Sequence, residues 1–267
     1  MPEPVVLYEK KDRVAIITFN RPEKMNCYNG DVMALIRKYF IDFREDNHLL
    51  VAILTGTGQK SFCAGADMRM TTPKEGEAPS TPMSGPHWHV GDVRVYKPVI
   101  AAINGFCLSG GLMHALSCDI RIAAEHAEFG IQQVRFGISS AASTQKLVRC
   151  IGLSNATYLS LTGIRISAQE ALRMGIIHRI TTLKDLMPAA FDMAELLMQN
   201  SPTHIRTRKE HLLRGQEMPY DEARSMGAFL EEQVPAVEKQ ELIRAFFEKR
   251  KPDMSKIPHT DIRSFGG

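Results

Sequence analysis

The first 45 residues change from strand-like to helix-like spacing of apolar positions. Residues 5–8 and 13–19 are short runs rich in β-branched and aromatic residues, with polar Lys10-Lys11-Asp12 between them. This pattern predicts a β-hairpin. Residues 29–44 carry apolar side chains at helical spacing, which predicts an amphipathic helix.

Continuous apolar runs come next along the chain. Residues 49–54, 98–103 and 120–124 have strand length and no polar alternation, as expected of strands that are buried on both faces. A glycine-containing turn and a predicted helix near residues 110–117 separate the last two runs. Strand, helix and strand in this order predict an α/β fold.

Two regions depart from this alternation. Residues 71–86 are rich in Pro, Gly, Ser, Thr and charged side chains and predict a loop, which is either a lid or an inert surface insertion. From Ser143 onward the pattern is helical, with a predicted capping box at residues 167–170. We expect a core of residues 1–200 and a C-terminal helical region of residues 201–267, which packs on the core or on a neighbouring subunit.

Composition narrows the class of protein. The chain has 267 residues, of which 44% are hydrophobic and 24% charged, and this balance excludes wholesale disorder. A net charge of +3 is too small to indicate a nucleic-acid partner, and no apolar run reaches the ~20 residues of a membrane span. The first residues show no secretory signal, and the five cysteines form no CxxC pair. We therefore expect a cytoplasmic protein with reduced thiols and no metal site.

Two glycine-containing segments are candidates for the chemistry. SFCAGADM at residues 61–68 follows a predicted strand, and NGFCLSGGL at residues 104–112 lies between a strand and a helix. Small residues let a ligand approach the backbone, and the amides at the start of a helix favour negative charge. Neither segment matches a Walker loop or a GxGxxG fingerprint.

These segments belong to a longer ordered series. It comprises NRPEKMN at 20–26, AGAD at 64–67, KPVIAAING at 97–105, GG at 110–111, CDIR at 118–121, FG at 129–130 and IRAFFEKRKP at 243–252. The series closely resembles the crotonase (enoyl-CoA hydratase/isomerase) family, over nearly the whole chain.

The resemblance implies an α/β crotonase fold, a ClpP-like spiral of repeated ββα units with a C-terminal helical region, assembled as a homotrimer or a dimer of trimers. It implies an acyl-CoA thioester as partner and no separate cofactor, since coenzyme A is part of the substrate. The thioester oxygen would lie between the backbone amides of Ala66 and Gly110. Two fixed donors there would stabilise the negative charge of an enolate.

The resemblance also implies which residues hold coenzyme A. The backbone around Lys24, Ala64 and Met68 would hold its adenine end. Ala66 and Asp67 belong to the same binding set, and Phe246 and Lys249 would contribute from the tail. Asp67 and Asp119 also match positions where relatives carry an aspartate that holds the backbone.

The chain departs from the family at its two catalytic glutamates. Counting along the motifs places these positions at Met113 and Gln133. A thioether carries no proton at neutral pH, and a carboxamide orients water or a carbonyl without acting as a general base. The usual two-carboxylate hydration therefore lacks both of its carboxylates.

Three functions fit this pattern. The first is an acyl-CoA enzyme of the hydratase/isomerase type, with altered acid–base residues at Met113 and Gln133. The second is a non-catalytic acyl-CoA-binding homologue, which needs the amide pair only. The third is a thioester hydrolase or decarboxylase that uses His87 or His89 of the predicted lid, since histidine titrates near neutrality.

Overall fold

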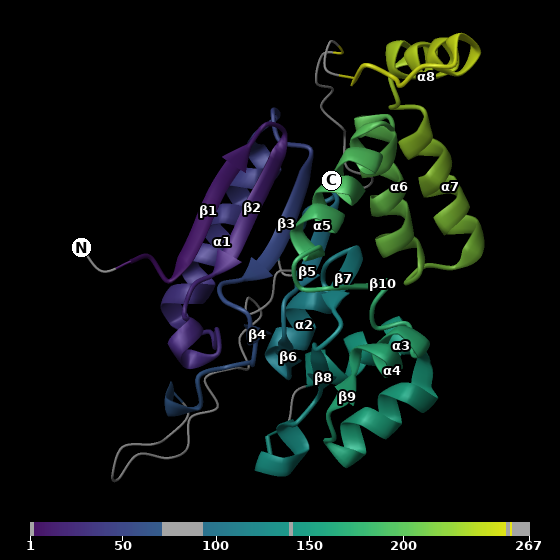
Figure 1. The fold of residues 1–267 in the computed structure, drawn as a ribbon. Helices are drawn as coiled ribbons and strands as arrows, with labels where there is room; N and C mark the ends of the chain where they lie inside the picture. The colour runs from purple at the N-terminus through teal and green to yellow at the C-terminus, as the bar shows by residue number, and fades with distance from the viewer. Residues whose placement is uncertain (1–2, 71–92, 139–140, 255–256, 258–267) are drawn as a thin grey trace.

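The computed structural model describes residues 3–70, 93–138, 141–254 and 257. The predicted loop at residues 71–86 and the histidines His87 and His89 lie outside these residues. The described part of the chain forms two β-sheets with helices packed around them (Figure 1).

The predicted hairpin and the helix that follows it are confirmed. Strand β1 (Val6–Lys11) pairs antiparallel with β2 (Val14–Phe19) through a turn in which Asp12 has a φ of 51°. Helix α1 (Gly30–Glu45) begins where predicted, because the Asn29 side chain accepts a hydrogen bond from the amide of Val32 at 3.1 Å. A side-chain oxygen at this position satisfies an amide that has no partner within the helix.

From β3 to β8, consecutive strands alternate between the two sheets. The larger sheet has the order β1-β2-β3-β5-β7-β10 and the smaller sheet the order β4-β6-β8-β9. The remaining strands are β3 (Val51–Gly56), β4 (Ser61–Cys63), β5 (Val99–Ile103), β6 (Phe106–Leu108), β7 (Ile120–Ala124), β8 (Glu128–Gly130), β9 (Ile166–Ser167) and β10 (Arg179–Thr181). The successive pairs β3–β4, β5–β6 and β7–β8 advance in one direction, so the backbone describes a spiral.

The three apolar runs predicted to be buried strands are β3, β5 and β7. Both of their faces are covered. Ile53, Ile100 and Ile122 pack against α5 (Leu186–Met198), whereas Leu54 and Ala101 face the core that contains α1 and α2 (Gly110–Leu116). Burial on both sides explains why these segments lack polar alternation.

The helical prediction after Ser143 holds for most of the chain but misses two strands. Helix α3 (Ala141–Thr162) and α4 (Ala168–Arg173) flank β9, and β10 precedes α5. These strands have two and three residues, too few for a periodic signal. Only half of the predicted capping box forms: Ser167 accepts from the Glu170 amide at 3.3 Å, while the Glu170 carboxylate bonds Arg173 instead.

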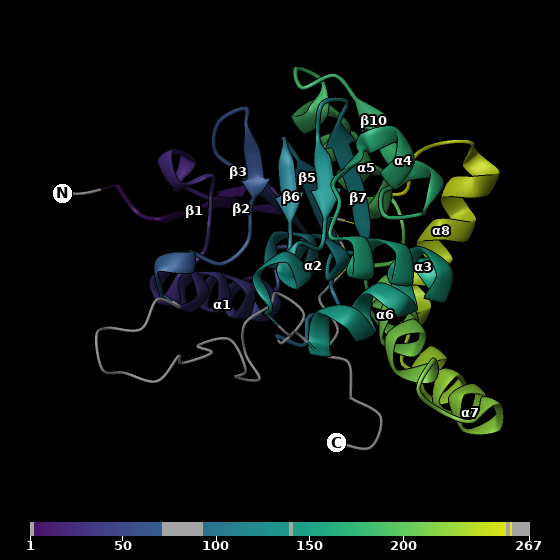
Figure 2. The ribbon, with the colours of Figure 1, turned by 90° about the horizontal axis from the view of Figure 1, so that it is seen from below.

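Three C-terminal helices stand beside the larger sheet: α6 (Pro202–Gly215), α7 (Tyr220–Glu231) and α8 (Ala236–Glu248) (Figure 2). The Glu238 carboxylate, 2% exposed, joins α8 to the start of α6 by accepting from the side chains of Ser201 and Thr203. Lys209 joins α6 to the core through Asp119 at 2.7 Å. The division at residue 200 stays a prediction.

All five cysteines are free thiols, and Cys63, Cys107 and Cys118 are fully buried.

None of the helices in the described ranges has the length and apolar character that crossing a bilayer requires.

Lys97 is a buried cation that joins β5 to the end of α1. It is 3% exposed, and its ammonium group donates to the carbonyl oxygens of Phe43 at 2.9 Å and Asp46 at 2.8 Å. Burial lowers the pKa of Lys97 to about 8, against 10.5 for an ordinary lysine. Between these values the unfolded chain binds more protons than the folded one, so the stability contributed by Lys97 rises with pH.

We therefore expect the free energy of unfolding of the wild type, relative to Lys97→Met, to increase between about pH 7 and about pH 9.5. Urea denaturation of both proteins at both pH values measures this difference. Lys38→Met, at an exposed position of α1, is the matched control. A difference that stays constant with pH would contradict the assignment.

Candidate active site

The two glycine-containing segments and the predicted Gln133 meet at one edge of the smaller sheet. Strands β4, β6 and β8 are parallel neighbours, so their carboxyl ends lie side by side. Ala66 follows β4, Gly110 follows β6 and Gln133 follows β8. The carboxyl edge of parallel strands is a common place for ligands in α/β proteins.

The two turns that follow β4 and β6 are in direct contact. A methyl group built on Gly65 would lie 3.3 Å from the Leu108 carbonyl oxygen and 3.5 Å from the Gly110 amide nitrogen. One built on Gly111 would lie 1.9 Å from the Cys63 carbonyl oxygen. Only glycine lets the start of α2 approach the end of β4 this closely.

The segment around Ala66 is held by Tyr28. The Tyr28 amide donates to the Gly65 carbonyl at 3.0 Å, and the Asp67 amide donates to the Tyr28 carbonyl at 2.9 Å. In an extended chain, successive amides point to opposite sides, so the Ala66 amide faces away from Tyr28. Among the described backbone bonds outside helices and strands, none uses the amide of Ala66 or Gly110.

Ser109 fixes the turn that leads to Gly110. Its φ of 51° and ψ of −118° are unusual for a residue with a side chain. Its amide donates to the Gly130 carbonyl at 2.7 Å, and its hydroxyl accepts from the Gln132 amide at 3.2 Å. These bonds compensate the strained backbone and tie the ends of β6 and β8 together.

Both residues at the expected acid–base positions are buried. Met113 is 1% exposed and lies in the first turns of α2, and Gln133 is 9% exposed at the start of the short 3-10 helix η4 (Gln133–Phe136). The Gln133 side-chain oxygen has no hydrogen-bond partner among the described residues. His114 is fully buried against Phe19 and Tyr28, in agreement with its prediction as a core residue.

The residues predicted to bind coenzyme A on either side of Ala66 lie in two short segments, which we call the rim: Lys24 in one, and Ala64, Ala66, Asp67 and Met68 in the other. Lys24 ends the 3-10 helix η1 (Pro22–Lys24), and Met68, 44% exposed, begins η2 (Met68–Met70). Ala64 lies between β4 and this helix and is half-buried.

Asp67 anchors this rim. Its carboxylate accepts hydrogen bonds from Arg69 at 2.9 and 2.7 Å and from Arg21 at 3.1 Å. The bonds from Arg69, followed by the one from Arg21, hold the pKa of the Asp67 carboxyl well below its usual value. Asp67 is therefore ionised at neutral pH and acts as an anchor of the loop.

The tail residues predicted to bind coenzyme A are not near this rim in a single chain. Phe246 lies on α8 with 77% of its surface exposed, and Lys249 caps the end of that helix. Helix α8 lies across the molecule from α1 in both views (Figures 1 and 2). The prediction that Phe246 and Lys249 help to bind coenzyme A at this rim therefore has no support within one chain.

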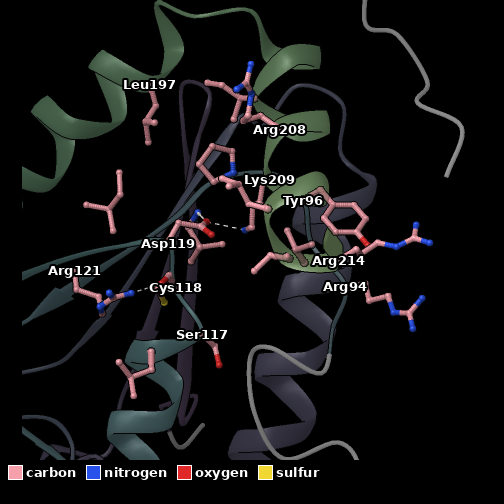
Figure 3. A pocket seen from close by; sticks show the side chains of 18 of the residues that line it. Arg94, Tyr96, Ser117, Cys118, Asp119, Arg121, Leu197, Arg208, Lys209 and Arg214 are labelled. Carbon is pink, nitrogen blue, oxygen red and sulfur yellow. Dashed lines mark hydrogen bonds and ion pairs between the residues drawn. The ribbon is translucent and has the colours of Figure 1, made fainter. Parts of the chain in front are cut away.

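A cavity of about 900 Å³ lies elsewhere, between the end of α2, the starts of β5 and β7, and helices α3 and α6 (Figure 3). Its lining includes none of Ala66, Gly110, Met113 or Gln133. Several of its cations are already paired, among them Lys209 with Asp119 and Arg214 with Glu210.

Two cysteines line the cavity, Cys118 and Cys150. Burial raises the pKa of the Cys118 thiol to about 12, which makes it a poor nucleophile at neutral pH. No local pattern in the sequence indicates this cavity, because its walls come from segments spread between residues 93 and 242. No group of three or more His, Cys, Asp or Glu side chains in the described ranges is arranged to hold a metal ion.

The architecture defines an α/β protein whose parallel strand ends carry two interlocked glycine turns. The enoyl-CoA hydratase/isomerase family model matches residues 9–256, and the chain belongs to this family. It is 35% identical over 255 residues to the short-chain-enoyl-CoA hydratase of Clostridium acetobutylicum, covering 92% of this chain and 95% of that protein.

Two further comparisons agree with this assignment. The mevalonyl-coenzyme A hydratase of Aspergillus fumigatus is 36% identical over 244 residues, with 90% of each chain covered. The crystal structure of an enoyl-CoA hydratase from Bacillus anthracis superposes with a TM-score of 0.84 at 31% identity, covering 93% of this chain and 98% of that one. The predicted crotonase fold is therefore confirmed.

The contact between the two glycine turns leaves no room for a side chain at position 111. Gly111→Ala forces a methyl group into the Cys63 carbonyl, and we expect a loss of about 3 kcal/mol or more in the free energy of unfolding. Urea denaturation measures it. Gly30→Ala is the control, because nothing lies within 4 Å of a methyl group there and alanine is the better helix former. Equal stabilities of the two variants would refute the interlock.

Proposed function

We propose that this chain is an acyl-CoA thioester enzyme that stabilises an enolate between the backbone amides of Ala66 and Gly110. The observation that carries the proposal is the direct contact of the turns that bear these amides. Formation of an enolate moves negative charge onto the thioester oxygen. Two donors fixed by the backbone stabilise that charge without reorganising, and one such donor is typically worth about 3 kcal/mol.

Coenzyme A would bind along the rim formed by Lys24, Ala64, Ala66, Asp67 and Met68. Exposed Lys24 and the pair of guanidinium groups around Asp67 give this rim a positive charge suited to phosphates. The chain works with no separate cofactor in this proposal. The tail residues Phe246 and Lys249 would complete the rim from a neighbouring subunit, in a homotrimer or a dimer of trimers.

Catalysis would use an acid–base set unlike that of the two-carboxylate hydratases. Gln133 is placed after β8 with a buried side-chain oxygen that has no partner within the described residues, which suits it to orient a water or a substrate carbonyl. Met113 would supply an apolar wall. Protons would then pass through the oriented water, with the amides of Ala66 and Gly110 holding the charge that develops.

Addition or loss of water and a shift of the double bond are both compatible with this arrangement. Turnover of some enoyl-CoA, followed by chromatography of the thioester products, tests the proposal. Gly110→Val should abolish that turnover, because a side chain at Gly110 would overlap the Tyr28 hydroxyl, which lies 2.1 Å from the position of the new carbon. Gly30→Ala is the control. Full activity of Gly110→Val would contradict the proposal that the amides of Ala66 and Gly110 bind the thioester oxygen.

A second candidate is a non-catalytic acyl-CoA-binding protein. The side chains of Met113 and Gln133 favour it, since neither exchanges a proton at neutral pH. Tight binding of a broad panel of thioesters by calorimetry, without turnover of any of them, would select this function over the first.

Restoring the two family carboxylates separates these possibilities further. Met113→Glu combined with Gln133→Glu should create measurable hydration of crotonyl-CoA, because it returns an acid and a base to the positions inferred from the motifs. Each single variant should gain much less, since the pair acts as a unit. A folded double variant without any gain would contradict the assignment of these positions.

A further inference from the structure

Tyr28 connects the two turns on which the proposed function rests. Its backbone forms a parallel bridge to Ala66, and its ring lies over Gly110. A methyl group built on Gly110 would be 2.1 Å from the Tyr28 hydroxyl oxygen and 2.7 Å from ring carbons Cε1 and Cζ. One residue therefore touches both of the segments whose amides are proposed to bind the thioester oxygen.

The Tyr28 hydroxyl is a buried polar group at the contact between these turns. The residue is 1% exposed, and its hydroxyl oxygen has no hydrogen-bond partner among the described residues. Leaving such a group unsatisfied typically costs about 1–3 kcal/mol. Phenylalanine would fill nearly the same space without that cost, so folding alone does not explain the hydroxyl. Such a group in a native protein calls for an explanation, and a hydrogen bond to a bound ligand is one that fits this position.

The surroundings keep this hydroxyl in its neutral form. Burial raises the pKa of the Tyr28 phenol above its usual value, and the edge-to-face contact with the His114 ring, at 5.1 Å between centroids, fixes the ring plane. A neutral phenol donates a hydrogen bond but does not remove a proton at neutral pH. Tyr28 is therefore a donor rather than a base.

The distances allow the hydroxyl and the Gly110 amide to share one acceptor. A Cβ position is about 2.5 Å from the amide nitrogen of its own residue, so the Tyr28 hydroxyl lies no more than about 4.6 Å from the Gly110 nitrogen. An oxygen that is about 2.9 Å from each donor fits any donor separation below about 5.8 Å.

We propose that the Tyr28 hydroxyl is a third hydrogen-bond donor to the thioester oxygen, beside the amides of Ala66 and Gly110. This inference rests on the proposed function. A third donor withdraws more charge from the carbonyl and so makes the α-proton more acidic, which matters in a site whose residues at 113 and 133 are not carboxylates. Tyr28 thus acts on the reacting carbonyl directly, and no proton leaves its oxygen during the reaction.

Tyr28→Phe tests this role because it removes the hydroxyl alone. The first measurement uses a conjugated, chromophoric enoyl thioester of coenzyme A, whose absorption moves to longer wavelength as its carbonyl is polarised. We expect the wild type to produce this red shift and Tyr28→Phe to produce a smaller one. Where a substrate turns over, kcat should fall by roughly 100-fold with little change in KM. The melting temperature should stay equal or rise, because an unsatisfied group is removed.

Tyr39→Phe, a partly buried tyrosine of α1 that stacks on Tyr8, is the matched control and should keep the full red shift. A wild-type red shift and kcat in Tyr28→Phe would overturn the inference and leave the amide pair intact. So would a lower melting temperature with the red shift kept, since the hydroxyl would then have a structural partner. Failure of the wild-type chain to bind the thioester at all would instead overturn the proposed function, and this inference with it.

Discussion

The candidate site depends on the close contact between the ends of two parallel strands. Glycine at 65 and 111 removes the side chains that would separate β4 from the start of α2, and glycine at 110 leaves room for the Tyr28 ring. The backbone bonds of Tyr28 hold the first of these turns, and its ring lies against the second. Amide groups are strong donors only when their positions do not relax as charge develops. The interlock supplies that rigidity, and the buried strands around it supply the frame.

The site combines this rigid backbone with side chains that carry no charge at neutral pH. Met113, Gln133 and Tyr28 are all buried, and none of them is ionised there. Charges lie on the rim instead, where the ion pairs of Asp67 with Arg21 and Arg69 remain partly hydrated. In the proposed function, this separation would stabilise a developing oxyanion in the interior and bind phosphates at the surface.

Two buried polar side chains at the site, Gln133 and Tyr28, have unused hydrogen-bonding capacity among the described residues. The Gln133 side-chain oxygen and the Tyr28 hydroxyl both lack hydrogen-bond partners among the described residues. Asn26, 1% exposed, differs, because its side-chain amide donates to the carbonyls of Thr57 and Ser61. Asn26 is a structural residue and its bonds are complete. Tyr28 and Gln133 keep hydrogen-bonding capacity among the described residues, which the proposed roles of both side chains require.

The sequence by itself determined the local elements and the family. Periodicity located the hairpin, α1 and the three buried strands, because spacing reports which faces are covered. The ordered motifs identified the family and showed that residues 113 and 133 are not carboxylates. Only the tertiary structure decided which segments meet. Nothing local indicates that residue 28 covers Gly110, since in sequence Tyr28 is one more apolar position before a helix. Strands β9 and β10 were also beyond prediction, because two or three residues become a strand only when a neighbour supplies the hydrogen bonds.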